Sequence, residues 1–466
     1  MGDIAMRKAL KLNIDPKMES KDQFKKHFDK TFDAIYDAID VPSLSLFQIV
    51  EQIKNFKFII DSKLVQIITQ NKLDHHFTDY HCPNCGNGLK EKYIQLREAV
   101  TTIGTLSFAC PYLRCASCKT NHTPYEDALN LKKGKYQHDV QKVAARMASG
   151  ETFEESAEML NEIYRFGISP DTVHTLTNDL ADEIQLSEIL PTAEELLEII
   201  NKISEGKKRR PVFVFTADGA MLPIRTEKLH APNCWKEARG IRGYLIDQDR
   251  IVHVLSWHQI ASKQDFLQYL IEIRDKNLIP PDLVRLCFIG DGAQWIWDLV
   301  QQVFPDCREV LDYYHCSEHL HAFAKLHFGE GKGQEWLEAT KARLFHNDAV
   351  QVIAGLKRMK CRLPEAQKNR DNLVGYLSNH KHRIDYGKCR RGGYPIGSGA
   401  IESANKFISH VRMKRSGAWW KVDYANNILK LRCARYNSKY DDAFNRYMAQ
   451  PKGQEPAAET KLSRIK

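Results

Sequence analysis

The sequence predicts a multidomain α/β protein, and three observations support this fold class. The chain has 466 residues, more than one domain usually holds, and 43% of them are hydrophobic, enough for at least one sizeable core. Cysteine, glycine and proline are concentrated in residues 81–122, between two stretches with the apolar spacing of helices. From residue 211 onward, apolar strand-like runs alternate with helical runs, which is typical of a sheet covered by helices.

Residues 1–78 are expected to form a helical N-terminal region. Apolar side chains recur there at three-to-four spacing and indicate a face that packs on a core or a partner helix: Phe24, Phe28, Phe32, Ile35 and Ile39. The first residues lack the compact charged-then-apolar layout of a secretion signal, and no run approaches 18 apolar residues. The sequence therefore predicts a cytoplasmic protein with no membrane partner.

Residues 79–130 predict a zinc-binding β-module. Two CxxC pairs, Cys82 with Cys85 and Cys115 with Cys118, are separated by a probable β-hairpin over residues 100–108. Four thiolates suit a tetrahedral structural Zn²⁺, which would stabilise a module too small for a core of its own. The long spacing leaves other ligands open, namely Cys110, His81 and His122. A redox dithiol pair is the alternative, but the flanking βαβ pattern of such proteins is missing.

Residues 131–205 predict a helix-turn-helix DNA-binding domain. Residues 138–148 and 153–160 have helical patterns, and Ser169-Pro170 is a favourable start for a third helix. The third helix would present short polar side chains to base edges in a major groove: Thr172, His174 and Thr175. A plain helical hairpin without DNA contacts remains the alternative.

Residues 206–328 predict the first part of a catalytic domain. Two apolar strands lead to an acid followed by glycine and alanine, at Asp218 and at Asp291. Residues 243–257 between them predict an antiparallel pair of strands, and residues 263–275 a helix. With the strand at 309–312, this order of elements is that of the RNase H fold. In that fold the first and fourth strands end side by side, so the two acids are expected to meet; taken singly, each Asp could also be a turn or cap residue.

Residues 395–448 predict the last part of this domain and its third acid, Glu402. A glycine-rich lead, Pro395–Gly399, precedes a helix in which Glu402 has small neighbours. Three acids can share two Mg²⁺ ions roughly 3.5–4 Å apart, which is the arrangement for metal-assisted phosphoryl transfer. We therefore expect Asp218, Asp291 and Glu402 to be catalytic residues and ligands of two Mg²⁺ ions, for which Mn²⁺ is expected to substitute.

The segment from Lys381 to Tyr440 is strongly basic. It holds 14 Lys and Arg against three acidic residues, and this excess is larger than the net charge of +9 of the whole chain. Such a concentration predicts contact with double-stranded DNA, while a solvated basic face is the alternative. The side chains expected to hold the backbone or stack on an unpaired base are these: Arg412, Lys414, Arg415, Trp419 and Trp420. Burial of the two tryptophans in a core is an equally valid interpretation, and the tail 449–466 is expected to be disordered.

Together these motifs resemble the bacterial insertion-sequence DDE transposases of the ISKra type, which are relatives of the Mutator-like group. The resemblance covers about residues 80–440 and includes the two CxxC pairs, Thr216–Gly219, Gly290–Ala293, Leu311–His315 and Gly397–Ser403. It implies that residues 329–394 are a helical insertion within the catalytic domain. It also implies a C/D-x-x-H motif, for which two frames fit, Asp312 with His315 and Cys316 with His319. Its position at the strand end favours the first frame, so His315 is an expected accessory residue of the active site.

The predicted function is that of a DNA transposase that cleaves and joins DNA strands. The expected partners are the terminal inverted repeats of its element and target DNA, bound by a homodimer or higher oligomer in a nucleoid-associated, cytoplasmic bacterial protein. Two alternatives remain: an RNase H-like nuclease without strand transfer, and a DNA-binding regulator derived from a transposase. The presence of all three acids argues against the regulator.

Overall fold

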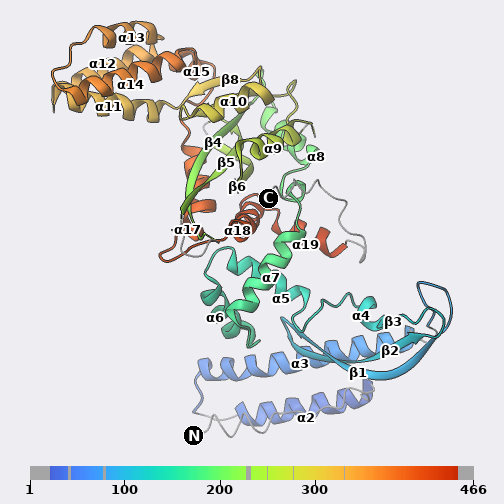
Figure 1. Ribbon diagram of the computed structural model, residues 1–466. Helices are drawn as coiled ribbons and strands as arrows, with labels where there is room; N and C mark the ends of the chain where they lie inside the picture. The colour runs from blue at the N-terminus through green and yellow to red at the C-terminus, as the bar shows by residue number, and fades with distance from the viewer. Residues whose placement is uncertain are drawn as a thin grey trace. The chain divides into compact units, whose positions relative to one another are not determined.

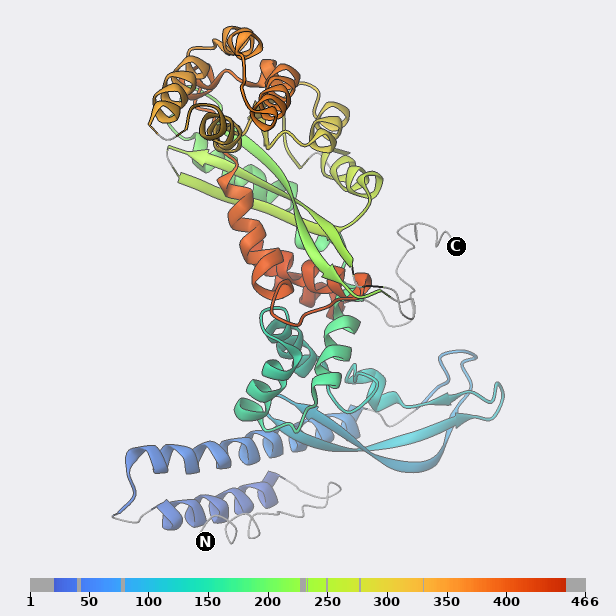
Figure 2. The ribbon, with the colours of Figure 1, turned by 60° about the vertical axis from the view of Figure 1, so that its left-hand side comes forward.

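The computed structural model describes residues 21–39, 43–76, 80–226, 232, 234–248, 250–275, 278–329 and 331–449 (Figures 1 and 2). The chain divides into two compact units, residues 1–148 with 153–177, and residues 149–152 with 178–466. Among the helices in the described ranges, none is both long and apolar enough to cross a bilayer. Apart from Ala449, the predicted disordered tail lies outside the described residues.

The first unit begins with two helices and a three-stranded sheet. Its elements are α2 (Lys21–Ile39), α3 (Leu46–His76), β1 (Leu89–Thr101), β2 (Gly104–Cys115), β3 (Asn121–His122) and α4 (Pro124–Ala128). β1 and β2 form a long antiparallel hairpin, and β3 pairs with the far end of β2. Of the predicted apolar stripe on α2, Phe28 and Phe32 are exposed, whereas the side chains of Phe24, Ile35 and Ile39 lie outside the described part.

The open edge of β2 is covered by α3 through a side-chain amide. Gln70 accepts a hydrogen bond from the Ala109 N–H (3.0 Å) and donates one to the Ala109 carbonyl (3.3 Å). One turn earlier, Gln66 accepts from the Ser107 N–H (3.3 Å). A primary amide has a donor and an acceptor side by side, so it can replace one residue of a missing strand. The edge of β2 is thereby satisfied without a further strand.

Three short helices complete the first unit: α5 (His138–Ala148), α6 (Phe153–Tyr164) and the first part of α7 (Pro170–Glu183). They enclose a core in which small side chains such as Ala144 and Ala157 allow close packing against Leu160 and Val173. The loop between α6 and α7 is held by Asn161, whose amide pairs with both the N–H and the carbonyl of Ile168, at 2.8 and 2.9 Å.

The second unit is built on a five-stranded sheet. Its strands are β4 (Val212–Ile224), β5 (Cys234–Asp247), β6 (Arg250–Ile260), β7 (Arg285–Gly290) and β8 (Arg308–Leu311), in the spatial order β6-β5-β4-β7-β8. β4, β5 and β6 are antiparallel, whereas β7 pairs parallel with β4, and β8 with β7. Parallel strands need crossover connections, which α9 (Lys263–Asp275) and α10 (Gln294–Val303) provide.

Helices surround this sheet. η1 (Leu186–Ile189) and α8 (Ala193–Ser204) precede it, and the chain returns after it in α16 (Gly399–Asn405), the π-helix η3 (Lys406–His410), α17 (Val411–Met413), α18 (Val422–Tyr436) and α19 (Tyr440–Ala449). α18 packs on β6 (Figure 1). The amide of Asn426 pairs with the N–H and carbonyl of Ile260, and that of Asn437 pairs with those of Ser256. The edge strand β6 is thus closed in the same way as β2.

A group of helices lies between β8 and α16 in the sequence. It contains α11 (Tyr313–Phe328), α12 (Lys332–Phe345), α13 (Ala349–Arg358), α14 (Pro364–His380), η2 (Lys381–Arg383) and α15 (Tyr386–Arg391). α11, α12, α13 and α14 pack on one another (Figure 1). Residues 329–394 are therefore largely helical, and α11, which follows β8 directly and precedes the predicted stretch, packs with them.

The order of strands and helices from residue 211 to 328 agrees with the prediction, with one correction. Asp218 does not end its strand: β4 continues six residues further, to Ile224, because β5 remains paired with it over its whole length. Pairing of β4 with β7, by contrast, ends at Thr216. The chain around Asp218 therefore has a strand on one side only.

We predict that Gln70→Ala exposes the edge of β2. Without the amide, the Ala109 N–H and carbonyl lose their partners, at a cost of about 1–3 kcal/mol. Hydrogen–deuterium exchange of residues 105–111 should then become about 5- to 150-fold faster. Lys72→Ala, an exposed change on the same helix, is the control and should leave exchange unchanged. Equal exchange in both variants would show that Gln70 does not protect this edge.

Candidate functional site

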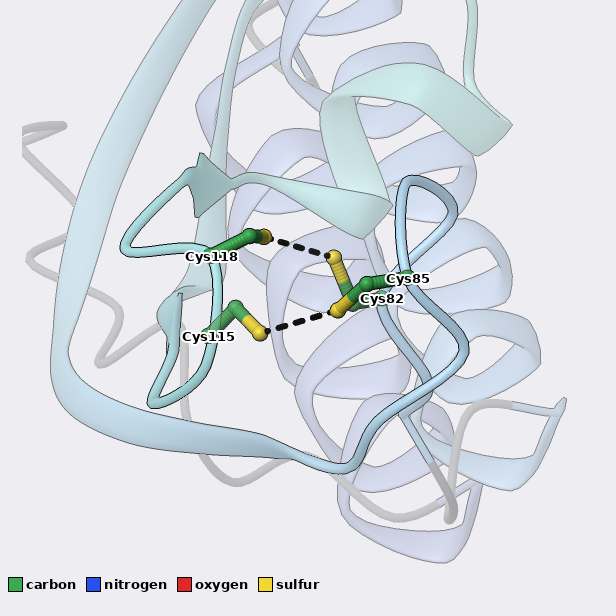
Figure 3. Close-up of side chains that lie close together, drawn as sticks. All are labelled: Cys82, Cys85, Cys115 and Cys118. Carbon is green, nitrogen blue, oxygen red and sulfur yellow. Dashed lines mark hydrogen bonds between the residues drawn. The ribbon is translucent and has the colours of Figure 1, made fainter.

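The four predicted zinc ligands form one cluster. The sulfur of Cys82 lies 3.5 Å from that of Cys118, and the sulfur of Cys85 lies 3.4 Å from that of Cys115 (Figure 3). All four sulfurs lie within 4.8 Å of one another, and no other set of three or more metal-ligating side chains in the described residues meets this spacing. Tetrahedral Zn²⁺ with bonds of about 2.3 Å places its sulfurs about 3.8 Å apart. The cluster could therefore hold a zinc ion.

The two CxxC turns have the same backbone structure. In each turn, the residue after the second cysteine has a positive φ, 72° at Gly86 and 62° at Lys119. Its N–H bonds to the carbonyl of the first cysteine, at 2.8 Å in one turn and 3.2 Å in the other. Register explains the long sequence spacing, since Leu89 pairs with Cys115 at the open end of the β1–β2 hairpin. A hairpin of this length must lie between the turns if they are to meet.

The structure separates the alternative zinc ligands. Cys110 is fully buried in the apolar core under the sheet, where burial raises the pKa of its thiol to about 12. His81 is exposed, and its backbone bridges to Gly88. His122 lies beside the cluster, with Nε2 3.4 Å from the Cys82 sulfur and 2.9 Å from the Thr120 hydroxyl. His122 is therefore placed to hydrogen-bond a thiolate.

Asp218 and Asp291 lie level on neighbouring parallel strands. Thr216 of β4 pairs with Ile289 of β7, and each acid follows its paired residue by two positions. Side chains two residues apart lie on the same face of a sheet, and residues paired across parallel strands share that face. Asp218 and Asp291 are both half-buried there.

Glu402 reaches the same site on α16. Asn405, one helical turn after Glu402, donates a hydrogen bond from its amide to Asp218 Oδ2 (2.7 Å). Residues three apart share a helix face, so Glu402 lies on the side of α16 that faces Asp218. Two contacts hold the start of α16: Arg242 of β5 donates to the Ala400 carbonyl (2.6 Å), and Ser398 bonds Asp312. Arg432 of α18 holds η3, which follows α16, by donating to the carbonyls of Phe407 and Ile408.

These three residues, the acid site, have no cationic partner. None of Asp218, Asp291 and Glu402 forms an ion pair with Lys, Arg or His in the described part of the chain. The pKa of Asp218 is raised above its ordinary value of 3.8, first because burial disfavours the charged carboxylate and then because Asp291 and Glu402 repel it. The N–H groups of Gly219 and Asn405 partly offset this rise. A site of this kind favours a bound cation.

Glycine follows Asp218 and Asp291 for different structural reasons. Gly292 has a φ of 107°, and a Cβ there would lie 2.6 Å from the ring of Tyr376 on α14. The Tyr376 hydroxyl also donates to the Asp291 carbonyl (2.9 Å), so the helical group holds the backbone that carries this acid. Gly219 has no positive φ, but a Cβ there would meet the carboxyl group of Glu237 on β5.

The two C/D-x-x-H frames occupy different environments. Asp312 is buried, caps α11 through the Tyr314 N–H (2.8 Å) and accepts from Ser398, so it fixes the segment that leads to Glu402. His315 lies 3.5 Å from Glu318. The rings of His319 and Tyr376 lie 4.5 Å apart at a tilt of 42°, and the pKa of His319 is lowered by partial burial and by His315, with Asp291 acting in the opposite direction. His319 thus contacts the tyrosine that holds the Asp291 backbone, and the role expected for His315 stays a prediction.

Sequence reasoning missed Asn405 and Tyr376. Asn405 could have been found from its spacing, because a polar residue three positions after the catalytic candidate Glu402 lies on the same helix face. Tyr376 has no such signal, since it is 85 residues from Asp291. Asn405 is also buried, and its amide oxygen has no hydrogen-bond partner in the described residues.

The predicted DNA contacts on α7 are only partly presented to solvent. Thr172 is half-buried, with its hydroxyl 2.9 Å from that of Ser169. His174 lies edge-to-face on Phe153 (4.9 Å), and partial burial lowers its pKa. Thr175 is exposed and donates to the Asp171 carbonyl (3.0 Å).

The basic segment divides into structural and exposed groups. Arg412 is buried and stacks on Trp420, which is itself buried and donates from Nε1 to the Met413 carbonyl (3.0 Å). Arg415 pairs with Glu151, whereas Lys414 and Trp419 are exposed. The expectation that all these side chains face DNA does not hold for Arg412 and Trp420, because both close the core between α17 and the end of β4. Seven of the 14 basic side chains are exposed: Lys381, Lys388, Arg390, Arg391, Lys406, Lys414 and Lys421.

The fold and these sites define a mixed α/β protein with a four-cysteine cluster and a separate acid site without cationic partners. No protein-family model matches the chain. The chain is similar to the UPF0236 protein in vanSb 3'region of Streptococcus gallolyticus, at 23% identity over 363 residues, which cover 75% of this chain and 74% of that protein. Among solved structures it is similar to the Drosophila P element transposase strand transfer complex, at a TM-score of 0.24 and 9% identity, covering 68% of this chain and 81% of that one. A TM-score this low does not establish a common fold, and neither match names the ISKra type.

We predict that the cysteine cluster binds about one zinc ion per chain. Cys82→Ser combined with Cys115→Ser should release the metal and increase proteolysis within residues 80–125, because binding stabilises the folded module. Cys110→Ser and Cys361→Ser are controls that should retain zinc, the first because Cys110 belongs to the apolar core. Mass spectrometry of the wild-type protein measures the number of zinc ions per chain. Wild-type protein without zinc would refute the site.

We predict that Asp218→Asn raises the melting temperature of the metal-free second unit. A carboxyl whose folded pKa is raised destabilises the fold where it is ionised, and this penalty grows as pH rises through 3.8 and the raised value, then stays constant. The substitution should therefore stabilise the protein at pH 7, with the gain vanishing below pH 3.8. Tryptophan fluorescence is a suitable probe, because all seven tryptophans lie after residue 178. Asp298→Asn, which removes a partner of Lys263, is the control and should not stabilise. A lower melting temperature for Asp218→Asn at pH 7 would contradict the prediction.

Proposed function

We propose that the protein is a DDE-type DNA transposase with an RNase H-like catalytic domain. The observation that carries this proposal is the convergence of Asp218, Asp291 and Glu402 from β4, the end of β7 and α16, with no basic side chain of the described residues paired to them. A stable fold would gain from a basic partner at such a place. The lack of a basic partner in the described residues favours a function that requires the negative charge of the three acids.

The sheet supports the same proposal. The RNase H proposal requires a sheet that is antiparallel over its first three strands and parallel over the rest, and the order β6-β5-β4-β7-β8 meets this requirement. In this arrangement the first and fourth strands are neighbours, and their acids lie at one height. The helical group that includes α14 would be the insertion of the catalytic domain.

The residues of the acid site fit divalent metal ions. Carboxylate oxygens are the ligands that Mg²⁺ prefers. Two Mg²⁺ ions held by Asp218, Asp291 and Glu402 would activate the attacking water or 3′-hydroxyl and stabilise the leaving oxygen. Mn²⁺ is expected to replace Mg²⁺.

Other side chains of the chain would position the acids. Asn405 fixes one oxygen of Asp218 and the Gly219 N–H fixes the other, so both carboxylate oxygens are oriented. Tyr376 holds the backbone of Asp291, and Arg242 holds the first turn of α16. These groups act through the acids and do not themselves react with a phosphate. His319, next to Tyr376, is better placed than His315 to assist.

DNA binding would be divided between the two units. In the first, α5, α6 and α7 would form a helix-turn-helix with Thr175 as the most exposed of its three predicted contacts, beside a zinc-stabilised hairpin. In the second, the exposed lysines of the basic segment, including Lys406, Lys414 and Lys421, would contact phosphates. Because an element has two ends, we expect two or more copies to act together on double-stranded DNA that carries its terminal repeats.

We predict that Asp218→Asn, Asp291→Asn and Glu402→Gln each lower strand cleavage and strand transfer by more than about 10³-fold. Each change keeps the side-chain shape but removes a charge that holds metal. The losses should be strongly non-additive, so that the triple variant is hardly worse than each single variant. The assay uses labelled duplexes with the inverted repeats that flank the gene, in Mg²⁺ and in Mn²⁺.

The control is Asp298→Asn, whose carboxylate bonds Lys263 and Gln294 on the surface and should not be needed for activity. Near-normal strand transfer by Glu402→Gln in Mg²⁺ would show that the third ligand is misassigned. If the wild-type protein cleaves DNA but does not join it, the protein is an RNase H-like nuclease and not a transposase.

A further inference from the structure

A pocket lined by arginines lies at the other end of the parallel strands. It has a volume of about 660 Å³ and is bordered by Arg285 at the start of β7 and by Arg308 at the start of β8. Asp291 follows the opposite end of β7, so the pocket is separate from the acid site. Pockets of roughly 300–1,000 Å³ are the size that small ligands occupy.

Acidic side chains balance the charge of this pocket only in part. Arg210 donates to two backbone carbonyls (3.1 Å each), and Arg285 donates to the carbonyls of Arg210 (2.8 Å) and Gly392 (2.6 Å). Within the described residues, neither guanidinium has an acidic partner. Arg308 lies 3.8 Å from Asp385, and the exposed Arg274 pairs with its neighbour Asp275 (2.8 Å). One acid, Asp306, lines the pocket against four arginines.

The pocket also has an apolar and aromatic wall. Leu286, Val303 and Phe304 contribute to it, and the ring of Tyr394 lies 5.1 Å from the Arg285 guanidinium. This stacking and the two carbonyl bonds hold Arg285 in one orientation, so little conformational entropy is lost when it binds an anion. A surface groove that binds only the DNA backbone needs no apolar wall, whereas a pocket for a ligand with a flat apolar group does.

We propose that this pocket binds a nucleotide, with the phosphate on the arginines and the base against the apolar wall. Guanidinium groups match phosphate oxygens in pairs, and their planes stack on bases. Asp306, which also lines the pocket, would accept a hydrogen bond from a sugar hydroxyl or a base amino group. The nucleotide is either free or the phosphorylated end of a DNA strand. The proposal goes beyond the proposed catalytic function, since no residue of the acid site takes part.

The test is isothermal titration calorimetry of the full chain with AMP, with adenosine and inorganic phosphate as separate probes. We expect saturable binding of AMP at one site, and weaker binding of each separate probe. Arg274→Gln and Arg308→Gln should each weaken AMP binding at least about tenfold, because each removes a charged phosphate donor. Arg250→Gln, an exposed arginine on β6, is the matched control and should bind AMP normally. Circular dichroism checks that each variant is folded.

Competition identifies the source of the nucleotide. Displacement of AMP by a 5′-phosphorylated single strand, but not by the same strand without phosphate, assigns the pocket to a DNA end; no displacement assigns it to a free nucleotide. Asp291→Asn should retain AMP binding, so this result is independent of the catalytic test. The proposal is overturned if the folded wild type does not bind AMP, or if Arg274→Gln and Arg308→Gln bind it as the control does. In that case the arginines only hold the surrounding loops.

Discussion

The parallel pairing of β4 with β7 is the constraint on which the acid site depends. Because Thr216 is paired with Ile289, Asp218 and Asp291 fall at the same height on the same face. A shift of one residue would turn one acid to the opposite face, where apolar residues belong. Pairing of β7 with β8 places Asp312 next in this row, where it caps α11 and bonds Ser398. The register of these strands thus fixes the positions of Asp218 and Asp291, and also that of Asp312, which holds the segment leading to Glu402.

The edges of both sheets are closed by amide side chains. Gln70 pairs with Ala109 at the edge of β2, while Asn426 and Asn437 pair with Ile260 and Ser256 at the edge of β6. Each amide replaces one residue of a strand and leaves a helix packed on the edge. At β6 the two amide pairs also fix α18. Arg432 of this helix donates to the carbonyls of the π-helix that follows Glu402, so the amide pairs help to position the acid site. A π-helical turn leaves carbonyls out of regular register, and a buried arginine satisfies them.

Local patterns predicted most of the helices and strands, and they identified the four cysteines that cluster and the three acids that the structure brings near one another; the catalytic role of the acids stays a prediction. Long-range contacts that belong to no motif could not be predicted in this way. The charge of the basic segment suggested DNA, yet Arg412 stacks on Trp420 and Arg432 is so buried that its pKa falls to about 10. Nothing in the spacing of these arginines distinguishes them from the exposed Lys414. Tyr376 was missed for the same reason, since its role appears only when α14 lies beside Gly292.

The acid site is assembled from parts that are distant in sequence, and this has an energetic consequence. Burial, and then repulsion by Asp291 and Glu402, raises the pKa of Asp218 and destabilises its ionised form, so the site must be held by bonds to the backbone around it. Those bonds come from β5 through Arg242, from α14 through Tyr376, and from α18 through Arg432. Each donates to a carbonyl and leaves the carboxylates themselves without a cation. Arg242 and Arg432 therefore stabilise the site indirectly, without neutralising its negative charge.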